Sequence, residues 1–292
     1  MKKLIAILLM SMVVSTTWAK DITKITVPVP VGGTWDAVAR SLAKHMEDHT
    51  SDTVLVENRP GAMSQIGIRN FVSTSTRENS ILVAMGEVFA VDFEGSDQVL
   101  PIAYIGSIPE SIVVRSTSKL SQVTDLVTAQ NRVTVACVGA GGLVRFLITS
   151  SKNANLDCVP YKGAPQAVND VMGGHVDVAI SGIANAKALR ESGRIKILGY
   201  TGNKRSHLVP DVPTLLEQGI DLPSSLKFWV FVHKDTPPKK IEELQKIIST
   251  TVNGPKFKSA THDLGLAIDP YSGSAADYFY RHVKLVQNLY KK

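Results

Sequence analysis

Cysteine is scarce in this sequence, and the patterns of several functional classes are missing. Only two cysteines occur among the 292 residues, and neither belongs to a CxxC pair, so a thiolate metal site is not expected. Charged residues make up 20% and aromatic residues 6% of the chain. The net charge of +6 is scattered rather than gathered in a basic stripe with interleaved aromatic rings. Nucleic acid is therefore not an expected partner.

The short motifs of common enzyme classes are also absent. The sequence has no P-loop, no GxSxG nucleophile elbow and no HExxH zinc motif. His45 and His49 are four residues apart on one predicted helix, a possible metal spacing, but they fall at its end with Glu47 and Asp48 between them. We expect no metal, no cofactor and no catalytic residue, and hence a protein that is not an enzyme.

Residues 1–19 have the layout of a secretory signal peptide. Lys2 and Lys3 supply a positive start, Leu4 to Val14 is apolar, and Thr17 and Ala19 occupy the two positions that a signal peptidase reads. The alternative, a membrane anchor, would need about 20 apolar residues, and this run is shorter. We expect cleavage after Ala19 and a mature protein outside the cytoplasm. No cysteine follows the run, so a lipid anchor is not expected there.

The two cysteines lie on predicted strands that one helix connects. In an oxidising compartment Cys137 and Cys158 could form one disulfide, or they could remain two buried thiols. Neighbouring strands lie about 4.8 Å apart, which allows the Cα atoms to come within disulfide range. The sequence leaves both alternatives open, because it does not fix the directions of the side chains.

Strand and helix patterns alternate along most of the chain. Short runs rich in Val and Ile and bounded by turn residues predict strands, and apolar residues at helical spacing predict helices. The β-α-β order predicts mainly parallel sheets with helices on their faces. The expected strands are 22–31, 53–57, 80–85, 112–115, 133–138, 158–161, 176–180, 195–200 and 228–232. The expected helices are 35–46, 66–72, 123–129, 143–151, 165–172, 184–191, 241–252 and 275–290.

Two such β/α units follow each other, and the last strand and helices need a surface on which to pack. The simplest arrangement returns the C-terminal segment to the first unit and gives a two-lobed α/β protein. We expect residues 20–110 with 225–292 in the first lobe and residues 111–224 in the second. A mature chain of about 270 residues suits two domains. The cleft between the lobes is the expected site, because open parallel sheets bind ligands at the carboxyl ends of strands.

In the first lobe, a strand runs into two glycines and then a helix. Glycine lets the backbone approach a ligand closely. A helix start offers unpaired N–H groups and the positive end of the helix dipole to an anion. A plain capped turn is the simpler alternative. The candidate ligand-binding residues of this loop are Val31, Gly32, Gly33, Thr34, Trp35 and Asp36.

A second glycine-rich loop links a strand and a helix in the other lobe. Val144 stands where the dinucleotide fingerprint needs its third glycine, and Asp157 lies at the beginning rather than the end of the next strand, so NAD binding is not expected. Arg145 could pair with a carboxylate or remain a solvated charge. The candidate residues are Gly139, Gly141, Gly142, Leu143 and Arg145.

Five stretches, in order along nearly all of the mature chain, are typical of one family. They are VPVPVGGTWDAVARSLAKHM from Val27, VENRPGAMSQIG from Val56, VPYKGAPQAVNDVMGGHVDVAISG from Val159, the segment that begins at Ser192 and ends RSHLVPDVPT, and DTPPKKIEEL from Asp235. With these motifs the chain resembles the tripartite tricarboxylate transporter substrate-binding family, also called the Bug family of periplasmic receptors. The resemblance implies a Venus-flytrap fold and a small carboxylate ligand, which the loops 31–36 and 139–145 would grip from opposite lobes.

Several residues depart from the family pattern in the expected cleft. Trp35 replaces a small residue, and Leu143 and Arg145 stand where hydroxyl residues and a histidine are usual. Glu87 follows the third strand, and Ser181 stands where the family often has an acid that would hold a ligand ammonium. Glu87 and Ser181 therefore join the candidate binding residues. The changes suggest a less polar pocket with an aromatic wall and one strong cation, suited to an aromatic or otherwise apolar carboxylate.

The resemblance also implies partners. The expected partner is the membrane permease of a tripartite transporter, to which a monomeric, periplasmic receptor delivers its ligand. The alternative is a sensor role, in which the loaded receptor signals to a histidine kinase, and neighbouring genes would separate the two. An enzyme on the same two-lobed fold would need a placed nucleophile, base or cofactor, and a turnover assay would detect it.

Overall fold

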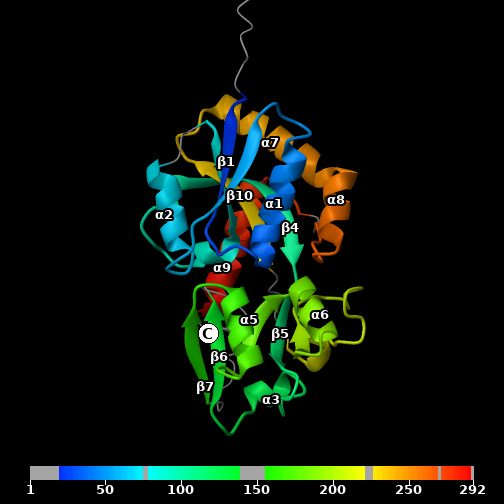
Figure 1. The fold of residues 1–292 in the computed structure, drawn as a ribbon. Helices are drawn as coiled ribbons and strands as arrows, with labels where there is room; N and C mark the ends of the chain where they lie inside the picture. Colours follow the sequence, from blue (N-terminus) through cyan, green and yellow to red (C-terminus); the bar gives the residue numbers. More distant parts are fainter. Residues whose placement is uncertain (1–19, 75–77, 139–154, 221–225, 269–270, 291–292) are drawn as a thin grey trace, which may run out of the picture.

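The computed structural model describes residues 20–74, 78–138, 155–220, 226–268 and 271–290. They form two lobes, each built on a five-stranded sheet with helices on its faces (Figure 1). The strand orders are β2-β1-β3-β10-β4 in lobe 1 and β7-β6-β8-β5-β9 in lobe 2. The predicted two-lobed α/β fold is confirmed.

Lobe 1 contains both ends of the described chain. Its strands are β1 (Ile22–Val27), β2 (Thr53–Asn58), β3 (Ser80–Met85), β4 (Val99–Ile108) and β10 (Leu226–His233). Its helices are α1 (Thr34–Met46), α2 (Gln65–Thr74), α7 (Pro238–Asn253), α8 (Pro255–His262) and α9 (Ala275–Tyr290), with the short 3-10 helices η1 (Gly86–Ala90) and η2 (Ser96–Gln98).

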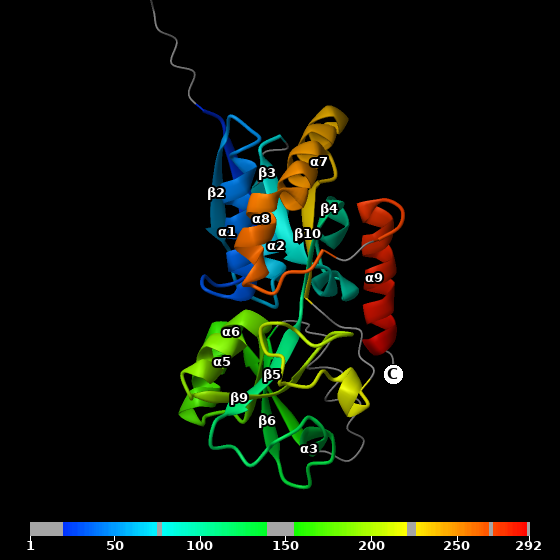
Figure 2. The ribbon, with the colours of Figure 1, turned by 90° about the vertical axis from the view of Figure 1, so that its right-hand side faces the viewer.

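Lobe 2 is formed by the middle of the chain. Its strands are β5 (Glu110–Arg115), β6 (Val133–Val138), β7 (Leu156–Tyr161), β8 (Val178–Gly182) and β9 (Ile195–Tyr200). Its helices are α3 (Thr124–Val127), α5 (Ala164–Gly173) and α6 (Ile183–Glu191), with η3 (Leu216–Gln218). Figure 2 shows α5 and α6 on the side of this lobe that faces lobe 1.

Each sheet has one strand that runs against the other four. In lobe 1 this strand is β10, which pairs antiparallel with β3 and β4, and in lobe 2 it is β5, which pairs antiparallel with β8 and β9. Both are the first strand that the chain forms after it crosses between lobes. The remaining strands keep one direction, so their carboxyl ends meet at one edge of each sheet, where such sheets bind ligands.

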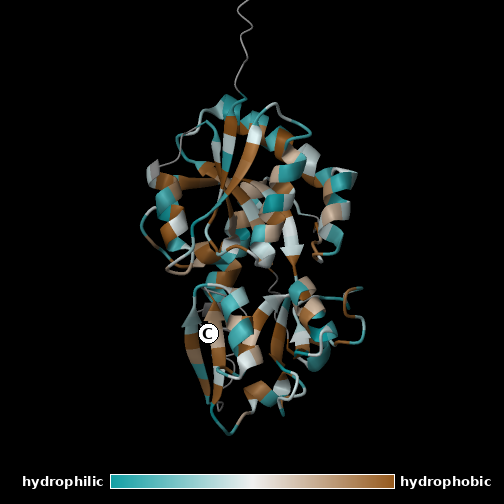
Figure 3. Cartoon of the chain, in the orientation of Figure 1, coloured by the Kyte–Doolittle hydropathy of each residue, from teal (hydrophilic) through white to brown (hydrophobic). Residues whose placement is uncertain are grey.

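The hydrophobic residues of α1 explain why it forms and where it packs. Trp35, Val38, Leu42 and Met46 recur at helical spacing and are all buried. Helices α7 and α8 pack against α1, whereas α9 contacts β4 and η1 and lies on the other side of the sheet (Figure 2). In Figure 3, hydrophobic residues follow the strands of both lobes, and hydrophilic residues gather on the outer faces of the helices.

One strand and one α-helix were not predicted from the sequence, and several predicted boundaries were wrong. Strand β4 contains Pro101, which cannot donate to a ladder, but β4 lies at the edge of the sheet, where β10 is its one neighbouring strand among the described residues, and therefore tolerates it. Helix α8 is short and polar. Strand β1 ends at Val27 rather than Val31, because Pro28 and Pro30 interrupt its hydrogen bonding. Strand β8 begins at Val178, two residues later than expected.

None of the helices in these described ranges has the length and apolar composition needed to cross a bilayer. The predicted signal peptide, residues 1–19, lies outside the described residues.

Candidate functional site

A cavity of about 100 Å³ lies between the two lobes. The residues after β1, β2 and β3 line it from lobe 1, and the ends of β6, β7 and β8 line it from lobe 2. One buried water needs about 10–15 Å³, so the cavity has room for several waters or a small organic molecule. The predicted binding residues that line it are Gly33, Thr34, Trp35, Glu87 and Ser181.

Three helix N-termini meet at this cavity, and each has a glycine at its N-cap. Gly33 caps α1, Gly163 caps α5 and Gly182 caps α6, and in none of them does a side chain bond to the free N–H groups of the first turn. All three glycines line the cavity. The positive ends of three helix dipoles therefore face one space, which favours a bound anion. At the start of α6 the first N–H group, that of Ile183, already donates to Pro109 O at 3.2 Å, so the later N–H groups of that turn are the ones left for a ligand.

Close packing between the lobes explains why two of these caps are glycine. A Cβ atom added to Gly182 would lie 2.1 Å from Thr34 Oγ1 of lobe 1, and one added to Gly163 would lie 2.8 Å from Pro30 Cγ. Asn185 of α6 also donates a hydrogen bond to Thr34 Oγ1 at 3.3 Å. The lobes thus touch directly beside the cavity.

Gly33 is less crowded than the sequence suggested. A Cβ atom at Gly33 would have its nearest neighbour, Pro165 Cδ, at 3.8 Å, which is an ordinary contact. Gly32 has a φ of +90°, a conformation that favours glycine, although it does not line the cavity. The two glycines of the first loop therefore have different roles: Gly32 permits the turn, and Gly33 caps the helix at the cavity.

Asp36 holds the first loop in place through hydrogen bonds. Its Oδ2 accepts hydrogen bonds from the Gly32 N–H and from Arg40 Nε, each at 3.0 Å, and its Oδ1 accepts one from Asn58 Nδ2 at 2.9 Å. Burial raises the pKa of this carboxyl, but the hydrogen bonds from Arg40, Gly32 and Asn58 outweigh burial and hold the pKa below its ordinary value. Asp36 is buried, and its oxygens hold the loop rather than facing the cavity.

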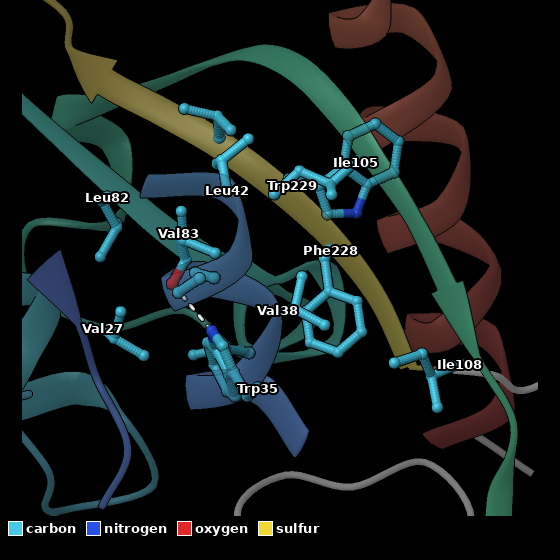
Figure 4. Close-up of a cluster of buried hydrophobic side chains, with 14 of the residues drawn as sticks. Val27, Trp35, Val38, Leu42, Leu82, Val83, Ile105, Ile108, Phe228 and Trp229 are labelled. Carbon is cyan, nitrogen blue, oxygen red and sulfur yellow. Dashed lines mark hydrogen bonds between the residues drawn. The ribbon is translucent and has the colours of Figure 1, made fainter. Parts of the chain in front are cut away.

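Trp35 lies at the cavity, but its ring belongs largely to the core of lobe 1. Its side chain is buried, its Nε1 donates a hydrogen bond to Val83 O at 2.9 Å, and its ring packs edge-on against Phe228 (Figure 4). The expected aromatic wall is therefore mainly a support for the start of α1. Val31, by contrast, is exposed and does not line the cavity.

Glu87 is a buried carboxylate on the wall of the cavity. It lies in η1, directly after β3, and its Oε1 is 3.0 Å from Nε2 of His282 on α9. Both side chains are almost fully buried. The second carboxylate oxygen, Oε2, has no hydrogen-bond partner among the described residues.

The second predicted loop follows β6 of lobe 2. Gly139, Gly141, Gly142, Leu143 and Arg145 lie outside the described residues. Val138, the last residue of β6 before this loop, lines the cavity. One residue earlier on β6, Cys137 is bonded to Cys158 of the neighbouring strand β7, with a Cα–Cα distance of 5.6 Å.

Several cavity-lining residues were not among the predicted binding residues, and they include two loop segments. The sequence from Lys162 to Pro165 has the same strand–glycine–helix signal as the first loop, so it could have been found by the same reasoning. Ala62, Met63 and Ser64 adopt positive φ angles of 44°, 53° and 75°, and the last two line the cavity. Such strained non-glycine residues gather at functional sites, but the sequence gives no signal for them.

Within the part of the chain that the structure describes, no three His, Cys, Asp or Glu side chains gather as metal ligands would. The features of the site are instead those of a receptor: two lobes, a cavity at the carboxyl ends of their strands, and helix N-termini around it. The class defined by this fold is the periplasmic binding protein.

The family follows from comparison with known proteins. A family model described as the tripartite tricarboxylate transporter family receptor matches residues 38–292, and the chain belongs to this family. Protein BugT of Bordetella pertussis is 28% identical over 243 residues, which cover 76% of this chain and 74% of BugT. The predicted membership of the Bug family of receptors is confirmed.

Solved structures show the same fold. The periplasmic binding protein BugD is 24% identical, with a TM-score of 0.81 over 94% of this chain and 96% of BugD. MatC from Rhodopseudomonas palustris with bound malate is 20% identical, with a TM-score of 0.80 over 92% of this chain and 99% of MatC. A second R. palustris protein, solved with adipate, is 21% identical, with a TM-score of 0.81 over 94% of this chain and 96% of its own.

Proposed function

We propose that this protein captures a small carboxylated solute in the cavity between its lobes and delivers it to the permease of a tripartite transporter. The observation that carries the proposal is the meeting of three glycine-capped helix N-termini at one cavity. A carboxylate there would accept hydrogen bonds from backbone N–H groups and benefit from the helix dipoles. The malate and adipate bound by proteins of the same fold support this ligand class.

The proposal includes export to the periplasm after cleavage behind Ala19, action as a monomer, and binding without chemical turnover. Family membership supports an extracytoplasmic receptor that acts beside membrane subunits. Mass spectrometry of the exported protein would show its first residue, and light scattering would show its mass. Recovery of an altered ligand after incubation would contradict a binding role.

The central test is a thermal-shift screen of the mature protein against carboxylates, followed by calorimetry on those that bind. Each acid is paired with its neutral amide, which has the same shape but no charge. We expect at least one acid to bind and its amide to bind at least tenfold more weakly, because the helix N-termini favour an anion. Equal affinity for acid and amide, or binding of neither across the library, would overturn the proposal.

A further inference from the structure

The described lining of the cavity carries more negative than positive side chains. Glu87 and Glu110 are both buried there, whereas Lys162 is the one basic residue of this described lining and is exposed. A ligand with carboxylates alone would bring further negative charge beside the buried side chain of Glu87. The described part of the wall therefore favours a ligand that also carries positive charge.

Glu87 lies close to the site expected for the carboxylate of the ligand. Strands β1 and β3 are parallel neighbours, so the loop that leads into α1 and the start of η1 lie at the same edge of the sheet. Gly33 and Glu87 consequently line the same cavity from adjacent strands. A small molecule whose carboxylate lies on the N-terminus of α1 therefore has Glu87 within the same enclosed space.

The hydrogen bonding of Glu87 leaves one carboxylate oxygen without a partner among the described residues. Its Oε1 is paired with His282, but Oε2, on a side chain that is 95% buried, has no partner among the described residues. A buried carboxyl oxygen without a hydrogen bond is unfavourable, and a donor from the ligand would remove that penalty. A protonated amine supplies both the hydrogen bond and the opposite charge.

The rest of the described wall is largely apolar, with Val29, Met85, Val88, Ile180 and Leu226 among its residues. We infer that the solute is a zwitterionic amino acid with an apolar side chain, whose ammonium group donates to Glu87 Oε2 while its carboxylate lies on the helix N-termini. This inference rests on the proposed function, because it assumes that the carboxylate binds at these helices.

Matched ligands test the inference on the unaltered protein. Leucine, methionine and phenylalanine are each compared by calorimetry with the acid in which hydrogen replaces the amine and with the acid in which a hydroxyl replaces it. We expect at least one of the amino acids to bind at least tenfold more tightly than both of its analogues. Tighter or equal binding of the deaminated acids would overturn the inference and leave carboxylate binding intact. Equal binding of the hydroxy acid would show that Glu87 requires a donor but not a cation, and would also overturn it.

Variants then assign the effect to Glu87. Glu87→Gln should weaken binding of the preferred amino acid roughly tenfold to a hundredfold. The affinity for its deaminated analogue should stay unchanged or rise slightly, because only the amine contacts the carboxylate. Glu243→Gln, the same change on the exposed face of α7, should alter neither affinity. Unfolding of each variant without ligand shows whether it is folded. An equal loss for both ligands in folded Glu87→Gln would overturn the role of Glu87, and failure of every acid to bind the native protein would overturn the proposed function as well.

Discussion

The two lobes share a strand plan but differ in what fills their cores. The core of lobe 1 is rich in large rings, including Phe71, Phe228, Trp229, Phe231 and Phe279. The cluster that lies within lobe 2 consists of Ile, Val and Leu side chains, among them Ile112, Val114, Val135 and Leu198. Large rings are thus concentrated in the core of lobe 1, whereas lobe 2 relies mainly on aliphatic side chains together with one fully buried ring, that of Tyr200 on β9.

The lobes also differ in what supports their sheets from outside. Helices α1, α7 and α8 cover one side of the lobe 1 sheet, and α9 lies on the other (Figure 2). In lobe 2, the disulfide between Cys137 and Cys158 links β6 to the edge strand β7. Lobe 2 thus has a covalent link between two of its strands in addition to the helices α5 and α6 that pack on its sheet.

The largest expected effect is the loss of the central ring of lobe 1. Trp229 is fully buried, and its ring centroid lies 4.8 Å from that of Tyr104 and 5.4 Å from that of Phe279. Trp229→Ala should lower the free energy of unfolding by about 3–5 kcal/mol, because it removes apolar contacts and leaves a cavity. Urea unfolding followed by circular dichroism measures the change.

Ile112→Ala provides the matching change in lobe 2. Ile112 is also fully buried, but a smaller side chain is lost, and we expect a decrease of about 2 kcal/mol, at the low end for such truncations. If Ile112→Ala destabilised the protein as much as Trp229→Ala, the aromatic core would not be what distinguishes the lobes.

Removal of the disulfide should affect lobe 2 selectively. The two cysteines are 21 residues apart, and a link across a loop of this length stabilises by about 3 kcal/mol in the chain-entropy model. The tryptophans outside the predicted signal peptide, Trp35 and Trp229, both belong to lobe 1, so their fluorescence reports that lobe alone. In a Cys137→Ser, Cys158→Ser variant, we expect the circular-dichroism transition to shift more than the fluorescence transition. Two reactive thiols in the unreduced exported protein, or equal shifts, would contradict this expectation.

A contact between the lobes should control affinity. Gly182→Ala places a Cβ atom against Thr34 and should weaken ligand binding by about 1–3 kcal/mol, or roughly fivefold to a hundredfold, because overpacking opposes closure. Gly33→Ala changes an N-cap glycine of the same kind, but there the added Cβ atom fits. The loss of affinity should therefore be smaller than for Gly182→Ala. Calorimetry with one carboxylate compares them, and recovery of affinity in Gly182→Ala, Thr34→Gly would identify the clash as the cause.

Periodic elements were predictable from the sequence, and irregular ones were not. The bounds of β3, β6, β9 and α9 agree with the predicted ranges, because their apolar patterns are strong. Strand β4 was missed, since Pro101 and Gly106 interrupt its pattern and only the edge position and the register shifts against β10 accommodate them. The predicted end of β1 was also wrong, because Pro28 and Pro30 follow its last residue.

The candidate site was predictable where glycine follows a strand and not where distant residues meet. Gly33 and Thr34 were found from the strand–glycine–helix pattern, and they line the cavity. The partner of Glu87 was not predictable, because His282 is 195 residues away in the sequence. Trp35 begins the apolar stripe of α1, so its spacing already indicated the core position in which the structure places it.

The smallest expected effect concerns the anchoring of the first loop of lobe 1 by Asp36. Asp36→Asn keeps the shape of the side chain, but its amide turns an N–H group toward the donors at Gly32 or Arg40. We expect the free energy of unfolding to fall by about 1 kcal/mol, near the net contribution of one hydrogen bond. The pKa of Asp36 is lower in the folded protein than its unfolded-state value of about 3.9. The charged carboxylate therefore stabilises the fold fully above that unfolded-state pKa. This stabilisation is lost as the pH falls through the pKa that Asp36 has in the folded protein. The difference in unfolding free energy between native protein and variant should therefore be full at pH 7 and shrink below about pH 4. Urea unfolding at pH 7 and at about pH 3 measures it, and a difference that does not change with pH would show that the charge of Asp36 does not hold the loop.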